Sequence, residues 1–165
     1  MNFVKTVETM AVKKLISLAV LAVSIFFQIP GIWAEEDEMI QKKRAQCEEG
    51  NPEECFVMGE RYRIVDQDQK TALNFYIKAC DGDYMTGCID GGILLVMKGT
   101  PYSKQFKQAR KMFIKACKAG EDLSCFNMGS LYDKEGRQKK SLQYYLKACN
   151  MGNQAGCAKH KRLSR

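Results

Sequence analysis

Three stretches of the chain repeat one pattern of hydrophobic and polar positions, at residues 71–80, 108–117 and 140–149. Each ends in Lys-Ala-Cys, and small or apolar residues stand eight, five, four and one positions before the cysteine. Positions with this spacing lie on one side of an α-helix. The pattern therefore predicts three amphipathic helices. The repeated lysines, Lys78, Lys115 and Lys147, fall near the helix ends, where we interpret them as solvated charges at the negative end of the helix dipole.

A second helix is predicted after each of these stretches. Gly50, Gly120 and Gly152 follow a cysteine by three residues, where a left-handed residue commonly ends a helix. One copy differs and has Asp83 at this place. Asn51, Asp83 and Asn153 can then cap the next helix, so that the second cysteine of each pair falls in its first turn.

The second helices carry a repeated glycine, four residues after the cysteine, at Gly59, Gly92 and Gly129. A glycine inside a helix costs about 1 kcal/mol relative to alanine. Its repetition predicts that another helix approaches too closely there for a Cβ atom. The last copy has Lys161 at this position and is interpreted as a polar end cap.

The repeating unit is thus helix, tight turn, helix, with first cysteines 33, 37 and 32 residues apart. One helix pair cannot bury its own apolar stripe, but stacked copies can. The predicted fold class is all-α, an α/α solenoid. We expect an N-terminal capping helix with the first cysteine pair at 35–55, about three repeats at 56–157, and a basic tail at 158–165.

All eight cysteines fall into four pairs with seven residues between partners. The predicted disulfides are Cys47–Cys55, Cys80–Cys88, Cys117–Cys125 and Cys149–Cys157. The alternative, a metal site, is weaker because no C-x2-C occurs and the single histidine, His160, lies in a basic tail. No cofactor or metal is therefore expected. Each small disulfide loop contributes about 2–3 kcal/mol in the chain-entropy account.

The first 34 residues are typical of an export signal. Lys13 and Lys14 precede an apolar run at 15–27, and a cleavage point follows at Ala34. Met10 is an alternative start. A membrane anchor is the competing interpretation, but a spanning helix needs about 20 apolar residues. We expect a secreted or periplasmic bacterial protein, monomeric and without a stable membrane anchor after cleavage.

The net charge is moderately positive and narrows the expected partners only a little. Removal of residues 1–34, which hold three lysines and one glutamate, reduces the formal net charge from +7 to +5. We expect this excess to be spread over helix faces and concentrated only in the tail. Nucleic acid is not an expected partner. Weak attraction to anionic cell-wall polymers or membrane surfaces is one interpretation, and a solvated basic surface is the other.

The units at 78–88, 115–125 and 147–157, with CFVMG at 55–59 and CFNMG at 125–129, carry a resemblance. They resemble the Sel1-like repeat family, solenoids related in shape to tetratricopeptide repeats. More narrowly, they are similar to the Helicobacter cysteine-rich proteins, which are secreted and hold one disulfide per repeat. The resemblance covers roughly residues 40–160. The family's usual glycine-rich turn between its two helices is absent here.

The narrower resemblance implies weak β-lactam binding or hydrolysis, because those proteins are commonly described as β-lactamases or penicillin-binding proteins. The residues for such chemistry are not visible. No Ser-x-x-Lys occurs, one histidine cannot build a zinc site, and the cysteines are expected to be paired. A genuine β-lactamase, opening the lactam ring of penicillins or cephalosporins, remains the alternative to a binding scaffold, and its catalytic residues are unknown.

The scaffold hypothesis predicts a peptide, protein, peptidoglycan-like or β-lactam ligand on the concave face of the solenoid. The candidate groove residues are Asn74, Tyr76, Asn127, Tyr132, Gln143 and Tyr144. Tyrosine suits interfaces because it has an apolar body and a polar tip. The competing interpretation is that the tyrosines pack between helices and the amides face water.

Overall fold

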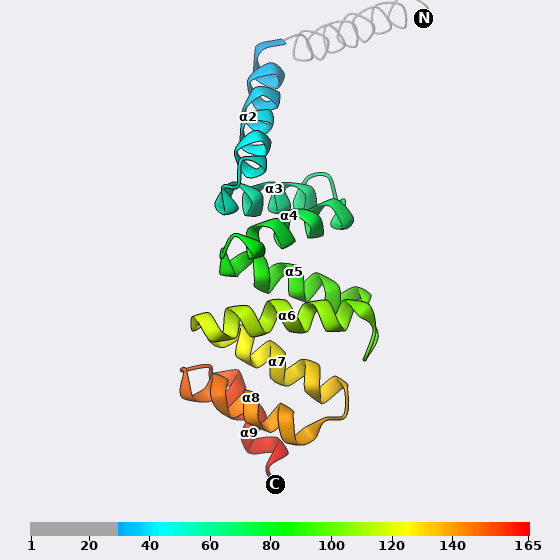
Figure 1. The fold of residues 1–165 in the computed structure, drawn as a ribbon, viewed down its shortest axis with the longest axis vertical. Helices are drawn as coiled ribbons and strands as arrows, with labels where there is room; N and C mark the ends of the chain where they lie inside the picture. Colours follow the sequence, from blue (N-terminus) through cyan, green and yellow to red (C-terminus); the bar gives the residue numbers. More distant parts are fainter. Residues whose placement is uncertain (1–29) are drawn as a thin grey trace, which may run out of the picture. The chain divides into compact units, whose positions relative to one another are not determined.

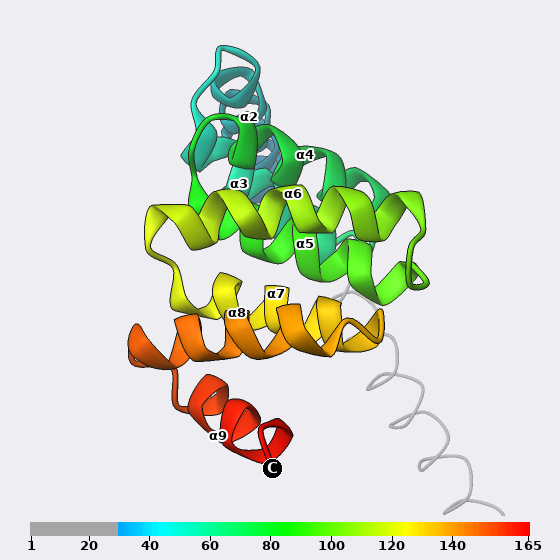
Figure 2. The ribbon, with the colours of Figure 1, turned by 60° about the horizontal axis from the view of Figure 1, so that its bottom comes forward.

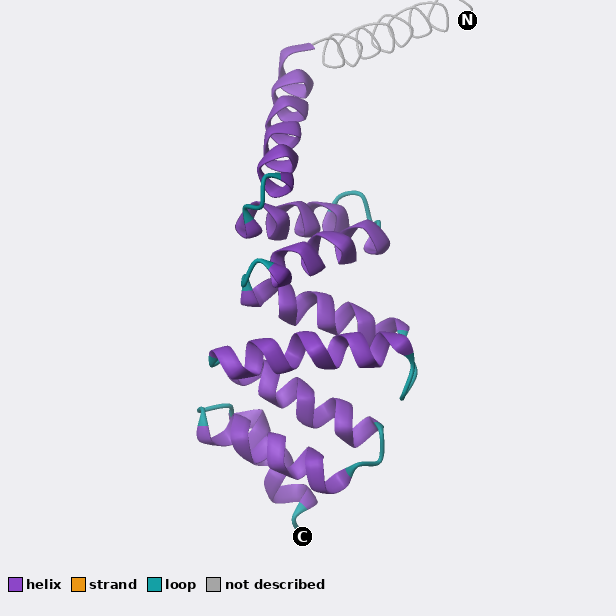
Figure 3. Cartoon of the chain, viewed as in Figure 1, coloured by secondary structure: helices purple, strands orange, loops and turns teal. Residues whose placement is uncertain are grey.

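The structure, a computed structural model, describes residues 30–165, with side chains from residue 37 onward. All regular structure in this range is helical, and no strand occurs in it (Figures 1 and 3). The described helices are α2 (Pro30–Glu48), α3 (Pro52–Ile64), α4 (Gln69–Asp81), α5 (Met85–Lys98), α6 (Lys104–Ala119), α7 (Asp122–Lys134), α8 (Gln138–Asn150) and α9 (Gln154–Leu163). The predicted all-α fold class is confirmed. None of the described helices is long and apolar enough to cross a bilayer.

The chain divides into two units between Gln41 and Lys42, and the repeats lie in the second unit, residues 42–165. In that unit, helices that follow one another in sequence pack side by side from α3 to α9 (Figures 1 and 2). α5 and α7 also touch. Because each helix contacts mainly its neighbours in sequence, the second unit is the stacked solenoid that the repeat predicts.

Helix contacts in the stack are of two kinds. The pairs α3–α4, α5–α6 and α7–α8, here called hairpins, pack extensively and are joined by loops without a disulfide. The pairs α4–α5 and α6–α7, here called junctions, pack less extensively and are joined by short turns that a disulfide spans. The covalent links therefore lie where the helices pack less extensively.

The hairpins are held by an aromatic ring packed on a glycine. A Cβ atom at Gly59 would lie 2.7 Å from the Tyr76 ring, and one at Gly129 would lie 2.6 Å from the Tyr145 ring. In the middle hairpin Phe113 packs on Gly92 in the same way, at 2.5 Å. Real Cβ atoms do not tolerate such distances, so the predicted close approach at the repeated glycines is confirmed.

All four predicted disulfides are present in the structure. Each joins the end of one helix to the first turn of the next, with Cα–Cα distances of 4.5–4.8 Å. All eight cysteines are paired, and no free thiol remains in the described range. Each bridge spans a separation of eight residues in the sequence. It thereby limits the angle between the two helices that it joins.

The turns under the disulfides use the predicted conformations, with one difference. Gly120 ends α6 with φ 107°, and Asp83 takes the left-handed place in its own turn with φ 66°. The Asn51 side chain accepts a hydrogen bond from Glu53 N at 3.1 Å and caps α3. The prediction that Asp83 caps the next helix is wrong. The N-cap of α5 is Tyr84, because Asp83 has a left-handed backbone and lies one residue before the cap. The Asp83 side chain pairs with Lys115 instead.

Two predicted boundaries, the basic tail at 158–165 and the cleavage point after Ala34, can be compared with the helices of the structure. Helix α9 continues to Leu163, so most of the predicted basic tail is helical, and Gln138 of α8 donates a hydrogen bond to the Leu163 carbonyl at 3.4 Å. The predicted cleavage point after Ala34 falls inside α2. The predicted apolar signal segment at 15–27 lies outside the described residues.

Candidate functional site

Tyr76 is not a groove residue. Its side chain has no exposed surface, because the ring packs on Gly59 in the first hairpin. Its hydroxyl donates a hydrogen bond to Glu60, and Arg63 Nε donates to the hydroxyl at 3.0 Å. Burial raises the pKa of the Tyr76 hydroxyl, and the hydrogen bond to Glu60 adds to the rise. The prediction that Tyr76 contacts a ligand is therefore wrong, and the packing interpretation holds.

Two acids near this network titrate differently. The hydrogen bond from Arg63 lowers the pKa of the Glu60 carboxyl, against the opposing effect of burial. Asp90 of α5 is half-buried, and burial raises its pKa, with the negative charge of Glu60 adding to the rise. The first two repeats therefore carry one well-paired acid, Glu60, and one poorly solvated acid, Asp90.

Tyr132 is also buried, at 6% exposure, and is not available to a ligand. Arg110 and Arg137 stack over its ring, with the guanidinium carbons 5.4 and 4.9 Å from the centroid. Glu135, fully buried at its side chain, pairs with both arginines. The predicted contact of Tyr132 with a ligand is wrong, because its ring already serves as the platform for this cationic cluster.

The remaining candidates are accessible but dispersed. Asn74 of α4 and Gln143 of α8 are exposed, and Tyr144 of α8 is half-buried. The Tyr144 ring lies 5.5 Å from the Tyr132 ring, centroid to centroid, which is a contact between two of the candidates. The six residues therefore do not form one groove, because Tyr76 and Tyr132 are buried and Asn74 and Asn127 line different hollows.

A different groove lies between α5 and α7. It has a volume of about 150 Å³ and is lined by Ile93, Val96, Met97, Phe113, Asn127, Ser130 and Leu131. We call it the α5–α7 groove. Ile93 is 36% exposed and Met97 73% exposed, an unusual state for neighbouring large apolar side chains on one helix face. The groove therefore presents an apolar surface to solvent.

Asn127 is the one predicted site residue that lines this groove. Its Nδ2 atom is buried and has no hydrogen-bond partner among the described residues. Buried amide donors are nearly always paired, and an unmet one costs about 1–3 kcal/mol. The groove thus combines exposed apolar side chains with an unused polar group, a combination that suits a ligand with a carbonyl and an apolar side chain.

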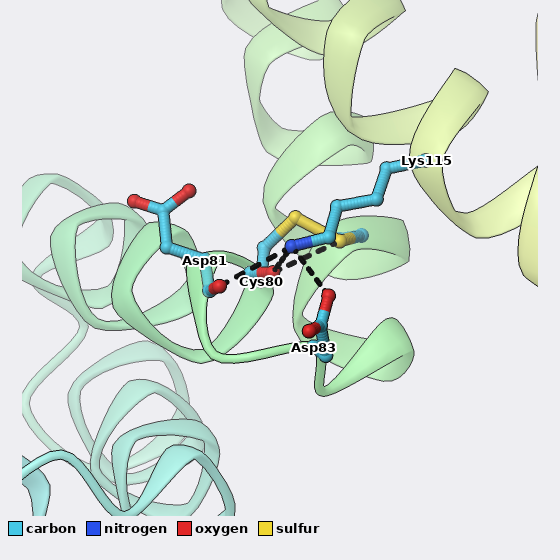
Figure 4. The surroundings of a disulfide bond; sticks show 5 residues. Cys80, Asp81, Asp83 and Lys115 are labelled. Carbon is cyan, nitrogen blue, oxygen red and sulfur yellow. Dashed lines mark hydrogen bonds and ion pairs between the residues drawn. A yellow bond between two sulfur atoms is a disulfide. The ribbon is translucent and has the colours of Figure 1, made fainter.

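Two of the repeated lysines, Lys115 and Lys147, reach from their own repeat to the end of a helix in the preceding repeat. Lys115 Nζ donates hydrogen bonds to the carbonyls of Cys80 and Asp81 and lies 2.8 Å from Asp83 Oδ1 (Figure 4). Lys147 Nζ reaches the Cys117 carbonyl at 3.5 Å. These lysines do meet the negative end of a helix, but of the preceding repeat, which corrects the expectation of freely solvated charges.

No catalytic arrangement is visible in the part of the chain that the structure describes. The cysteines are all in disulfides, and no group of three or more histidine, cysteine or acidic side chains could hold a metal ion within residues 37–165. His160 lies on α9, whereas Glu60 lies on α3 and the groove is lined by residues of α5, α6 and α7. The described residues therefore give no support to β-lactam binding or hydrolysis.

The hairpin stack and its open groove define a class of protein, a helical repeat scaffold clamped by disulfides. A sequence model of the Sel1 repeat matches residues 45–84, 91–121 and 123–153, so the chain belongs to the Sel1 repeat family. Such repeats generally mediate protein–protein interaction. With this repeat frame, each hairpin is one repeat and the central disulfides join neighbouring repeats.

A solved structure supports the fold. The chain is similar to a Sel1 repeat protein from Oxalobacter formigenes, with 18% sequence identity and a TM-score of 0.58. The match covers 74% of this chain and 96% of that chain. No curated protein matches the sequence.

The α5–α7 groove was not predicted from the sequence. Its signal was the uninterrupted apolar run at 93–97, which is wider than the single stripe a helix needs to bury. A helix of this type must leave some apolar side chains outside the core, and those are Ile93 and Met97.

Proposed function

We propose that this protein binds a peptide segment of a partner protein in the α5–α7 groove. The observation that carries the proposal is the unpartnered Asn127 amide beside the exposed Ile93 and Met97 side chains. An extended peptide supplies both missing elements, a backbone carbonyl for the amide and an apolar side chain for the groove. The general role of Sel1 repeats in protein–protein interaction supports it.

The residues that line the groove also indicate which class of ligand fits it. The groove is lined mainly by aliphatic and aromatic side chains, and charged groups are absent from its lining. An apolar side chain gains by entering such a groove, whereas a sugar leaves its hydroxyls unpaired. A peptide is therefore favoured over a peptidoglycan-like sugar, and lactam turnover is not proposed because no described residue is placed to perform it.

The location is a further part of the proposal. We propose that residues 1–34 are a signal peptide and that the mature protein works in the periplasm or outside the cell. Four disulfides support this, because such bonds persist in oxidising compartments. The disulfide in every repeat also favours the narrower kinship with the Helicobacter cysteine-rich proteins. Mass spectrometry of the exported protein is expected to find Glu35 at its N-terminus.

The binding test uses the oxidised protein, residues 35–165, against a phage library of short random peptides. We expect selected peptides to share an apolar anchor residue. Met97→Glu and Asn127→Ala are each expected to weaken these peptides by about tenfold or more. The matched control is Leu146→Glu, an exposed apolar residue on α8, 42% exposed, which should leave binding unchanged.

Three results would contradict the proposal. They are a library without enrichment, equal losses in Met97→Glu and Leu146→Glu, and sustained hydrolysis of a chromogenic cephalosporin that Met97→Glu abolishes. Circular dichroism of each variant establishes that the helices remain folded.

A further inference from the structure

Charge is distributed unequally between the two helices of the repeats. The helices that end in the repeated Lys-Ala-Cys, α4, α6 and α8, contain 11 lysines and arginines and one acid, Asp81. The helices that carry the repeated glycine, α3, α5 and α7, contain four basic and six acidic residues. The expectation of an excess concentrated only in the C-terminal tail is therefore wrong. The positive charge lies on one kind of helix, and most of it on α6.

Helix α6 carries a row of five lysines along one face. They are Lys104, Lys107, Lys111, Lys115 and Lys118. At 3.6 residues per turn these positions fall within roughly 80° of the helix circumference. The opposite side holds the buried Phe106, Ala109 and Phe113. Four of the five lysines have no acidic partner among the described residues, and Lys115 alone is paired.

A cleft lies beside this row, between α4 and α6. Its volume is about 440 Å³. Lys104, Lys107 and Lys111 line one side, and Ile77 and Met112 provide apolar surface. Asp81 is its single acid. Lys104 and Lys111 are about 10 Å apart along the helix axis, the length of two helical turns. We call it the basic cleft.

We propose that the basic cleft binds an acidic amphipathic segment of a partner protein. Asp or Glu side chains spaced by three or four residues match the spacing of Lys104, Lys107 and Lys111, and an apolar side chain of the same segment meets Ile77 and Met112. A recessed cleft with apolar surface favours such a segment over a lipid bilayer, which meets proteins as a flat surface.

This surface is separate from the α5–α7 groove. Phe113, which lines that groove, lies on the side of α6 opposite the lysine row. One chain therefore offers two sites with different chemistry, one apolar and one basic. The inference goes beyond the peptide binding proposed above and does not depend on it.

The test measures fluorescence anisotropy of a labelled peptide of glutamates with two leucines, added to the oxidised protein, residues 35–165. The variant is Lys104→Glu/Lys107→Glu/Lys111→Glu. The matched control is Lys159→Glu/Lys161→Glu/Arg162→Glu on α9, which changes the net charge equally. We expect the first variant to raise Kd by about 30-fold or more and the control by less than about threefold.

Two further measurements sharpen the result. Ile77→Ser is expected to weaken the leucine-containing peptide and not a peptide in which serine replaces both leucines. Met97→Glu is expected to leave both peptides unaffected, which separates this site from the α5–α7 groove. Binding of the acidic peptide should fall between about 50 and 200 mM NaCl, since exposed charges are screened.

Several outcomes would overturn the inference. Equal weakening by the two triple variants would mean that only net charge attracts the peptide. Absence of peptide binding, together with binding to phosphatidylglycerol vesicles that the α6 variant abolishes, would mean a membrane surface instead. All substituted lysines except Lys159 are exposed, and circular dichroism verifies that each variant is folded.

Discussion

The hairpins and the junctions of this solenoid solve the same problem by different means. In the hairpin α7–α8 the buried Tyr145 ring packs on Gly129, and no covalent link joins the two helices. In the junction α6–α7 the packing is less extensive, and the Cys117–Cys125 disulfide spans the turn. The disulfides therefore reinforce the helix contacts that pack less extensively.

The largest expected effect comes from breaking a hairpin. Tyr145→Ala should reduce the free energy of unfolding by about 3–5 kcal/mol, because it removes a fully buried ring and leaves a cavity. Gly129→Ala should cost about 1–3 kcal/mol through overpacking, despite the better helix propensity of alanine. Urea denaturation of the oxidised protein measures both.

The two hairpin changes are also expected to be coupled. The double variant should lose less than the sum of the single losses, since the new methyl group enters the space left by the ring. Leu146→Ala, which alters a partly exposed residue of the same helix, is the control and should change stability by less than about 1 kcal/mol. Additive losses would contradict the close contact of Gly129 with Tyr145.

Breaking a junction should have the next largest effect. Cys117→Ala/Cys125→Ala is expected to lower the free energy of unfolding by about 2–4 kcal/mol, mainly by releasing the unfolded chain. The same change in the terminal pair, Cys149→Ala/Cys157→Ala, should lower the free energy of unfolding by less than Cys117→Ala/Cys125→Ala does, because the terminal disulfide joins only α9 to the stack. A loss larger than that of Tyr145→Ala would reverse the order proposed for the two kinds of contact.

The lysine that bridges a junction should contribute less. Lys115→Met removes the hydrogen bonds to the Cys80 and Asp81 carbonyls and the ion pair with Asp83, and should cost about 1 kcal/mol. Lys118→Met, on the same face of α6 and without a partner in the described residues, should have no measurable effect. Thermal unfolding measures the melting temperatures of the two variants. Equal melting temperatures would contradict a stabilising contact of Lys115 with the end of α4 and Asp83.

The smallest effect depends on pH. Burial raises the pKa of Asp90, so the folded state binds its proton more tightly than the unfolded state does. The contribution of Asp90 to stability is therefore present at acid pH and is lost as the pH rises through its folded-state pKa. Asp90→Asn should stabilise the protein by less than about 1 kcal/mol at pH 7 and by nothing near pH 3. An equal gain at both pH values would mean that the charge is not the cause.

Most of the fold could be predicted, because the repeat places equivalent residues at equivalent points. The spacing of the cysteines indicated the disulfides, and the repeated glycines indicated the close helix approach that Gly59 and Gly129 make. The prediction that Asp83 caps α5 was wrong, since the choice between neighbouring cap residues depends on backbone conformation in a turn of few residues.

The candidate site was predicted poorly for a related reason. Tyr76 and Tyr132 have polar tips that could serve an interface, and their sequence positions do not tell whether a partner inside the protein already occupies them. In the structure Glu60 and Arg63 hold the Tyr76 hydroxyl, and two arginines cover the Tyr132 ring. Asn127 was among the predicted candidates and lines the α5–α7 groove, and its unpartnered amide is a property of its surroundings.

The sequence by itself determined the helices, the repeat and the cysteine pairing, because these depend on local spacing along the chain. The tertiary structure alone decided which side chains remain available. Ile93 and Met97 are exposed because α5 has more apolar residues than its neighbours can cover, and the lysines of α6 form one basic cleft because α4 lies beside them. Exposure and proximity depend on residues distant in sequence, and no local pattern contains them.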